Sequence, residues 1–277
     1  MGVGHAGQVM TDLHITSPAN PRLKELLGLR RRRTREQTGT TVLEGTEELR
    51  LAIEAGVTPF AVYHCPELMH EAGPQAVDAA RAVGAEVISL SREAFAKVSY
   101  REGPDGVLAT VPAPGRPWDE IELPAHPFVL VVEGVEKPGN LGAMLRTADA
   151  VGADLVIAAD CVTDWGNPNV IRSSKGTVFA VPVVSGTREQ AWTWLAERGV
   201  MVVATTPDTD RLHTDVDYRS GVAVAVGSEK YGLTQEALAG AAERVRIPMV
   251  GRVNSLNVAT SAAVVLYEAV RQRSAQR

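Results

Sequence analysis

The chain has 277 residues, a formal net charge of −5 at pH 7 and a hydrophobic content of 45%, enough to bury one large or two ordinary cores. No apolar run approaches the ~20 residues of a membrane span, and residues 1–14 lack a basic segment followed by an apolar core, so neither a membrane protein nor a secretory signal is predicted. The only two cysteines, Cys65 and Cys161, favour a reducing, cytoplasmic compartment.

A small α/β domain is predicted over residues 15–111, after a disordered tail at 1–14. Strands are expected near 41–44, 60–63, 86–89 and 107–111. Apolar residues at helical spacing before and between these strands predict helices near 19–34, 45–55, 73–83 and 91–97.

The first predicted helix carries a run of arginines. A solvated helix end is the plain interpretation of such a run. Because Leu23, Leu26 and Leu27 supply an apolar face that can fold the helix onto a core, a phosphate-binding patch is favoured instead. The candidate phosphate-binding side chains are those of Arg30, Arg31, Arg32, Arg33 and Arg35.

A proline-rich linker at 112–126 precedes a second predicted domain at 127–277. Its expected strands lie near 128–132, 155–158, 180–184, 201–205, 222–226 and 244–248 and alternate with helices. This alternation predicts a parallel sheet with helices on both faces. Such sheets bind ligands at the carboxyl ends of their strands.

One strand end of the second domain is especially informative. The segment 133–150, EGVEKPGNLGAMLRTADA, follows the apolar strand and opens a helix. Leu141, Leu145 and Ala148 recur at i, i+4 and i+7, which predicts a buried stripe with Arg146 off it. Neither G-x-G-x-x-G nor G-x-x-x-x-G-K-[ST] occurs in this segment, so a standard phosphate loop is excluded there.

Two later strands end in comparable segments, GSEKYGL at 227–233 and NSLNVA at 254–259. In chain order, E-x5-GN-x5-R-T-A, G-S-E-x-x-G-L and I-P-M…S-L-N-V-A resemble the three sequence motifs of the SpoU (TrmH-like) RNA ribose 2′-O-methyltransferases. The resemblance covers roughly residues 126–272.

The resemblance implies more than the pattern does. From periodicity, a plain doubly wound sheet would be expected, since knots are nearly absent from proteins. The family implies a deep trefoil knot, S-adenosylmethionine as cofactor and a homodimer through the catalytic domains, with each site at the subunit interface. The first domain, in its layout and in Glu44-Gly45, resembles the L30e-type RNA-binding domain that precedes the catalytic part of many members.

The cofactor carries no phosphate, in keeping with the missing phosphate loop. It needs backbone hydrogen-bond partners and apolar walls, and Gly227 and Gly251 would allow close backbone approach. Taken singly, each candidate is also an ordinary strand-end or turn residue. By resemblance, the cofactor-binding residues are Thr205, Thr206, Gly227, Ile247, Met249 and Leu256.

The resemblance makes Arg146 the central catalytic residue, although an arginine in this position is also typical of a surface charge. A guanidinium remains protonated in proteins, so a role as general base is not expected. We expect Arg146 to stabilise the developing alkoxide of the ribose and to hold a neighbouring phosphate with its planar fork.

The resemblance also assigns Asn140, Glu229, Ser255 and Asn257 to the catalytic site. Helix capping by Asn140, Ser255 or Asn257 and a plain surface charge at Glu229 are the alternatives. Two further basic residues, Arg172 and Lys175, are expected to line the RNA entrance. No metal site is predicted, because the histidines and cysteines lack the spacing of a zinc site.

Together these features predict S-adenosylmethionine-dependent 2′-O-methylation of a ribose in structured RNA, with ribosomal RNA, specifically the large-subunit 23S species, as first choice. The alanine- and arginine-rich composition is typical of a high-GC organism. A resemblance to avilamycin- and thiostrepton-resistance methyltransferases implies a role in self-resistance, with a housekeeping enzyme as the alternative. A transfer-RNA methyltransferase of the same family and a non-catalytic RNA-binding module are the alternatives.

Overall fold

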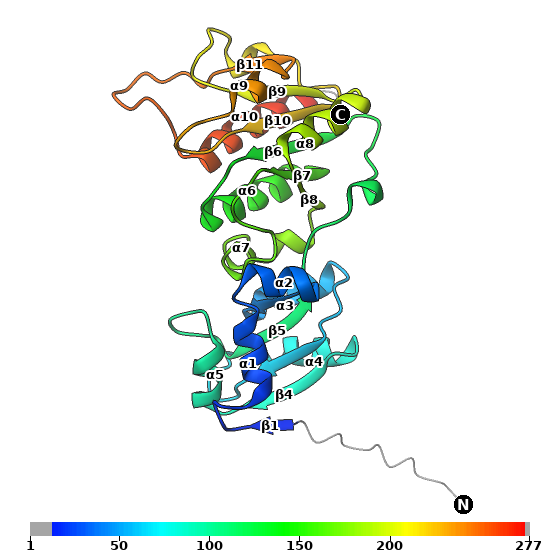
Figure 1. Cartoon of the computed structure of the whole chain (residues 1–277), viewed down its shortest axis with the longest axis vertical. Coiled ribbons are helices and arrows are strands. Elements are labelled where there is room, and N and C mark those ends of the chain that lie inside the picture. The colour runs from blue at the N-terminus through cyan, green and yellow to red at the C-terminus, as the bar shows by residue number, and fades with distance from the viewer. Residues whose placement is uncertain (1–12, 275–277) are drawn as a thin grey trace, which may run out of the picture.

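The computed structural model describes residues 13–274 and contains two sheets, each covered by helices and stacked along the long axis of the molecule (Figure 1). Most of the predicted tail at 1–14 lies outside the described residues. For Leu13 and His14 the prediction of disorder is wrong, because both belong to a strand that pairs with Ile88 and Ser89. No helix within 13–274 is long and apolar enough to cross a membrane.

The N-terminal sheet has the strand order β1-β4-β3-β5-β2, with β1, β4 and β3 parallel and β5 antiparallel to its two neighbours. Helices α1 and α5 cover one face, and α3 and α4 cover the other. The elements are β1 (Leu13–Ile15), α1 (Pro21–Gly28), α2 (Arg32–Thr38), β2 (Thr40–Glu44), α3 (Thr46–Glu54), β3 (Ala61–His64), α4 (Gly73–Ala82), β4 (Glu86–Leu90), α5 (Arg92–Val98) and β5 (Val107–Pro112).

The single helix predicted at 19–34 is in fact two helices. Asn20 caps α1 by accepting a hydrogen bond from the Arg22 backbone at 2.9 Å. The chain turns after α1, and α2 ends at Gly39, whose φ of 61° is left-handed. This break turns Arg35 toward the protein interior, where it is 3% exposed.

The C-terminal sheet is parallel throughout and has the order β11-β9-β10-β6-β7-β8. Helices α6 and α10 cover one face, and α8 and α9 cover the other, so the central strands β6 and β10 are apolar on both sides. The elements are β6 (Phe128–Glu133), α6 (Pro138–Val151), β7 (Leu155–Ala159), α7 (Pro168–Ser173), β8 (Val183–Gly186), α8 (Arg188–Glu197), β9 (Met201–Thr205), β10 (Val222–Val226), α9 (Gln235–Ala239), β11 (Glu243–Val245) and α10 (Val258–Ser274).

Helix α6 bears the predicted buried stripe, since Leu141, Leu145 and Ala148 are all fully buried. The strand expected at 180–184 lies later in the chain, at Val183–Gly186. A 3-10 turn at Thr177–Phe179 ends just before the predicted range, and Pro182, which has no backbone N–H, lies within it.

Candidate active site

A cavity of about 570 Å³ opens at the carboxyl ends of β9, β10 and β11, the edge at which parallel sheets bind ligands. Its volume falls within the usual range for small-molecule sites. The cavity is lined by every residue predicted to bind the cofactor, namely Thr205, Thr206, Gly227, Ile247, Met249 and Leu256.

Gly227 follows β10 at a point of close backbone approach. A Cβ built there would lie 2.0 Å from the Gly232 carbonyl carbon and 2.1 Å from the Leu233 nitrogen, so no side chain fits. The intervening loop is closed by hydrogen bonds from Ser228 N to Gly232 O at 3.1 Å and from Gly232 N to Ser228 O at 2.9 Å. The sequence therefore needs glycine at 227 to form this wall of the cavity.

The other walls combine apolar and acidic groups. Ile247 and Met249 are partly buried, and the charged lining consists of the carboxylates of Asp208 and Glu229 and the amine of Lys230, which leaves an excess of negative charge. Apolar walls beside negative charge suit a ligand that is organic and positively charged. Gly251 does not line the cavity and a Cβ there would meet no protein atom within 4 Å, so close approach of the cofactor at Gly251 stays a prediction.

Three predicted catalytic residues from distant segments form one hydrogen-bonded cluster. Asn140 Nδ2 donates to Glu229 Oε1, and Asn257 Nδ2 donates to Asn140 Oδ1 at 3.2 Å and to Glu229 Oε1 at 3.5 Å. Lys137 Nζ lies 3.5 Å from the same carboxylate oxygen. The starts of α6 and α10 are thereby joined to the loop after β10.

Of the residues for which helix capping was the alternative, Asn257 caps a helix and Asn140 does not. Asn257 caps α10, since its Oδ1 accepts from Ala259 N at 3.0 Å. Asn140 does not cap α6, because that position belongs to Lys137 and Asn140 lies in the first turn. Ser255 is exposed and lines the cavity beside Leu256.

Arg146 lies outside this cavity. It is exposed on α6, and within residues 13–274 its guanidinium has no hydrogen-bond or ion-pair partner. Arg172 and Lys175 are also exposed, at and just after α7, and Arg172 donates to Asn169 Oδ1 at 3.2 Å. All three side chains are thus accessible from solvent.

The arginine segment divides into two groups. Arg31 and Arg33 are exposed and have no side-chain partner among the described residues, whereas Arg30 donates to Ser99 O at 3.0 Å and Arg32 to Val162 O at 2.9 Å. For Arg35 the prediction of RNA contact is wrong. Its buried guanidinium is already taken up by a carboxylate of the second domain.

Glu133, the last residue of β6 and the first of the first motif, was assigned no role from the sequence. Its buried carboxylate accepts hydrogen bonds from Thr234 N at 3.0 Å and Thr234 Oγ1 at 2.7 Å, and Arg188 Nε lies 3.8 Å away. Glu133 thereby fixes the far end of the loop that begins at Gly227. The sequence signal that could have predicted this role is an acidic residue at the end of an otherwise apolar, buried strand.

Thiol and metal chemistry find no support in the described residues. Burial raises the pKa of Cys161 to about 11, which keeps its thiol protonated at neutral pH, and burial also raises the pKa of Cys65. Within residues 13–274 no group of three or more His, Cys, Asp or Glu side chains is placed to hold a metal ion.

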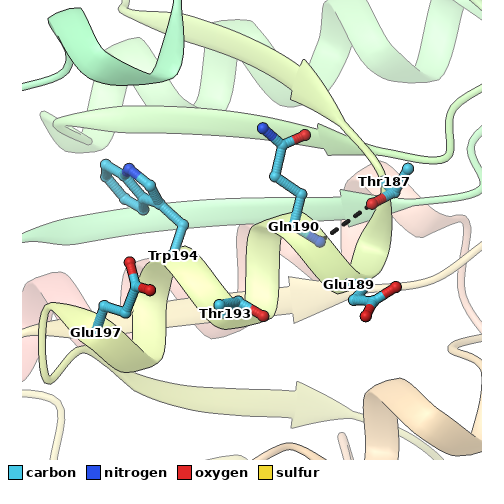
Figure 2. A pocket seen from close by; sticks show the side chains of 6 residues that line it. All are labelled: Thr187, Glu189, Gln190, Thr193, Trp194 and Glu197. Atoms are coloured by element: carbon cyan, nitrogen blue, oxygen red, sulfur yellow. Dashed lines mark hydrogen bonds between the residues drawn. The ribbon is translucent and has the colours of Figure 1, made fainter.

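A second hollow of about 390 Å³ lies along α8, on the sheet face opposite α6 and α10 (Figure 2). All of its lining residues come from α8 or its cap, where Thr187 Oγ1 accepts from Gln190 N at 3.1 Å. It contains none of the motif residues, so the site is assigned to the first cavity.

Comparison with known proteins decides the family. Residues 127–267 match the SpoU rRNA Methylase family, and residues 20–109 match the MRM3-like substrate binding domain. The chain belongs to the SpoU rRNA methylase family. Its membership confirms the family and the fold class predicted from the three motifs.

Several relatives resemble the chain over most of its length. It is 35% identical over 265 residues to an uncharacterized tRNA/rRNA methyltransferase of Synechocystis, covering 94% of each chain. It is 30% identical to a 23S rRNA guanosine 2′-O-methyltransferase of Bacillus subtilis, covering 91% of this chain and 97% of that protein. Among solved structures, the SpoU methyltransferase AviRb from Streptomyces viridochromogenes in complex with AdoMet matches with a TM-score of 0.85 and 27% identity, covering 93% of this chain and all of AviRb.

Proposed function

We propose that the chain transfers a methyl group from S-adenosylmethionine to a ribose 2′-hydroxyl of ribosomal RNA. The single observation that carries this proposal is the convergence of Asn140, Glu229 and Asn257 beside the cavity at the ends of β9, β10 and β11. Asn140 lies 89 residues before Glu229 and 117 residues before Asn257, so local structure alone does not bring these side chains together.

S-adenosylmethionine is the cofactor, and when bound it supplies a methyl group activated by a positively charged sulfur. The cavity fits this group, because Gly227 leaves backbone open to it, Ile247 and Met249 offer apolar walls, and Glu229 and Asp208 supply negative charge near a cation. The described lining also contains no phosphate loop, which this cofactor does not need.

The protein contributes chiefly positioning and electrostatics. The exposed fork of Arg146 would hold a substrate phosphate and would stabilise the negative charge that develops on the ribose 2′-oxygen. The displaced proton passes to the substrate phosphate or to solvent. Glu229, held by Asn140 and Asn257, keeps the three motif segments in register.

The working unit in this proposal is a homodimer formed through the catalytic domains. Arg146 is absent from the lining of the cavity, so a second copy would bring an arginine to each site. Val250, Val253 and Tyr267 are large apolar side chains left exposed on the cavity loops and on α10, and such side chains favour a buried interface. Sedimentation of the purified protein tests this.

The substrate belongs to the proposal as well. The exposed side chains of Arg31, Arg33, Arg172 and Lys175 favour structured RNA as the substrate. The two free cysteines, Cys65 and Cys161, favour a reducing, cytoplasmic setting. Incubation with tritiated cofactor and, separately, 23S RNA, 16S RNA and transfer RNA tests the substrate class. Label in 23S RNA alone supports the proposal, label in transfer RNA alone supports the alternative, and no label supports a non-catalytic module. A role in self-resistance stays a prediction, tested by drug sensitivity of a host that expresses the protein.

A further inference from the structure

The two domains meet through a buried ion pair at Arg35. Its Nη2 lies 2.6 Å from Asp164 Oδ2 and its Nε 3.2 Å from Asp164 Oδ1, while Nη1 donates to the carbonyls of Leu29 and Arg30. The two side chains are 4% and 20% exposed. A two-pronged pair of this kind fixes direction as well as distance, which a lysine could not do.

Further contacts surround this pair. The Thr41 hydroxyl of β2 donates to Gly166 O, and Arg32 of α2 donates to Val162 O at 2.9 Å. The proline-rich linker is also bound in place, because Arg116 N donates to Val183 O at 2.9 Å and Trp118 Nε1 to Ser185 O at 3.0 Å. Figure 1 shows α2 and α7 at the junction between the two domains.

The junction connects directly to the helix that carries Asn140 and Arg146. Asp164 and Gly166 lie just before α7. At the end of α7, Ser173 Oγ lies 2.6 Å from Asn169 O of its own helix and 3.1 Å from Pro138 O in the first turn of α6. A Cβ on Gly142 of α6 would lie 2.0 Å from Ser173 Oγ, so the two helices pack with no room for a side chain at this position. Movement of the first domain would therefore reach α6.

We propose that the Arg35–Asp164 pair is a positioning element that fixes the RNA-binding domain at one offset from α6, so that RNA held by the first domain presents one particular nucleotide to the transfer site. This inference rests on the proposed function. It assigns Arg35 to the geometry of the enzyme, and leaves Arg31 and Arg33 for phosphate contact.

The test compares wild type with Arg35→Lys, which keeps a charge but loses the fork, and with the double variant Arg35→Met/Asp164→Leu. Removing both charges avoids leaving an unpaired buried carboxylate, which would endanger folding. Arg22→Ala is the matched control, because it breaks an ion pair with Glu86 that is exposed and lies within the first domain. Calorimetry of cofactor binding verifies that each protein is folded.

In the double variant we expect cofactor affinity to stay at the wild-type value, KM for a structured 23S RNA fragment to rise about tenfold, and 2′-O-methyl groups to spread to nucleotides beside the main site. Arg35→Lys should fall between, and Arg22→Ala should match wild type. An unchanged KM with a single methylated nucleotide in the double variant would overturn the inference, as would a parallel loss of cofactor and RNA binding.

Small-angle scattering separates this inference from the proposed function. A broader distance distribution for the double variant than for wild type supports the positioning role even if neither protein transfers methyl groups to the RNAs tested, in which case only the proposed function fails. Identical distributions contradict the positioning role whatever the activity.

Discussion

The substitution Gly227→Ala tests the cavity most sharply, because it adds one methyl group where backbone atoms leave no room. The added Cβ would lie 2.0 to 2.2 Å from three backbone atoms of Gly232 and Leu233. Backbone cannot rotate away as a flexible side chain can, so the loop at 228–232 must retreat by at least about 1.4 Å to reach ordinary contact.

The expected magnitude follows from that displacement. Overpacking of a tight site costs about 1–3 kcal/mol, and if this strain is relieved by moving the cofactor loop, affinity for S-adenosylmethionine falls by about 5- to 150-fold. Gly251→Ala is the matched control, since a Cβ at residue 251 would meet nothing within 4 Å. The affinity of this variant for S-adenosylmethionine should equal that of wild type.

The assay is isothermal calorimetry with S-adenosylmethionine, accompanied by thermal unfolding of each variant. Wild-type affinity in Gly227→Ala would refute the placement of the cofactor against this loop. Equal losses in Gly227→Ala and Gly251→Ala would also refute it, because the structure distinguishes the two glycines so clearly.

Three further predictions concern single side chains. Arg146→Ala should lower the rate of methyl transfer, measured by tritium incorporation, at least about 100-fold while leaving cofactor affinity unchanged. An unchanged rate would show that Arg146 has no catalytic role. Asn257→Ala should lower the free energy of unfolding by about 1 kcal/mol, because the cap of α10 is lost. Asn257→Ser should restore the cap and the stability but not methyl transfer. Recovery of both stability and methyl transfer in Asn257→Ser, in denaturation and activity assays, would contradict a functional role for the cluster of Asn140, Glu229 and Asn257. The hydrogen bond from Arg271 lowers the pKa of Glu268 from 4.5 to about 2, so this carboxylate stabilises the fold above pH 4.5 and ceases to do so as pH falls toward 2. Urea unfolding should therefore find Glu268→Gln less sensitive to acid over that window than wild type, and identical profiles would contradict the assignment.

Much of the catalytic fold could be predicted from the sequence because its signals are local and repeated. Each strand end that forms the cavity follows an apolar run, and the stripe at Leu141, Leu145 and Ala148 has a clear helical period. The three motif segments indicated which strand ends meet at the site. The cavity consequently contains every residue predicted from the motifs to bind the cofactor.

The misses share a different physical origin, since each depends on a partner far along the chain. Leu13 and His14 form a strand only because β4 offers an open edge more than seventy residues later. Arg35 has the same local composition as its exposed neighbours, and only Asp164, 129 residues away, decides that it is buried. Glu133 looks like an ordinary strand end until Thr234 meets it.

The most direct test of the central claim is nucleoside mass spectrometry of 23S RNA after incubation with the purified protein and S-adenosylmethionine carrying a deuterated methyl group. We expect one 2′-O-methylated nucleoside to carry the label, with none when Arg146 is replaced by alanine. Label on a base, or no label in RNA under conditions where calorimetry detects the bound cofactor, would contradict ribose methylation by this site.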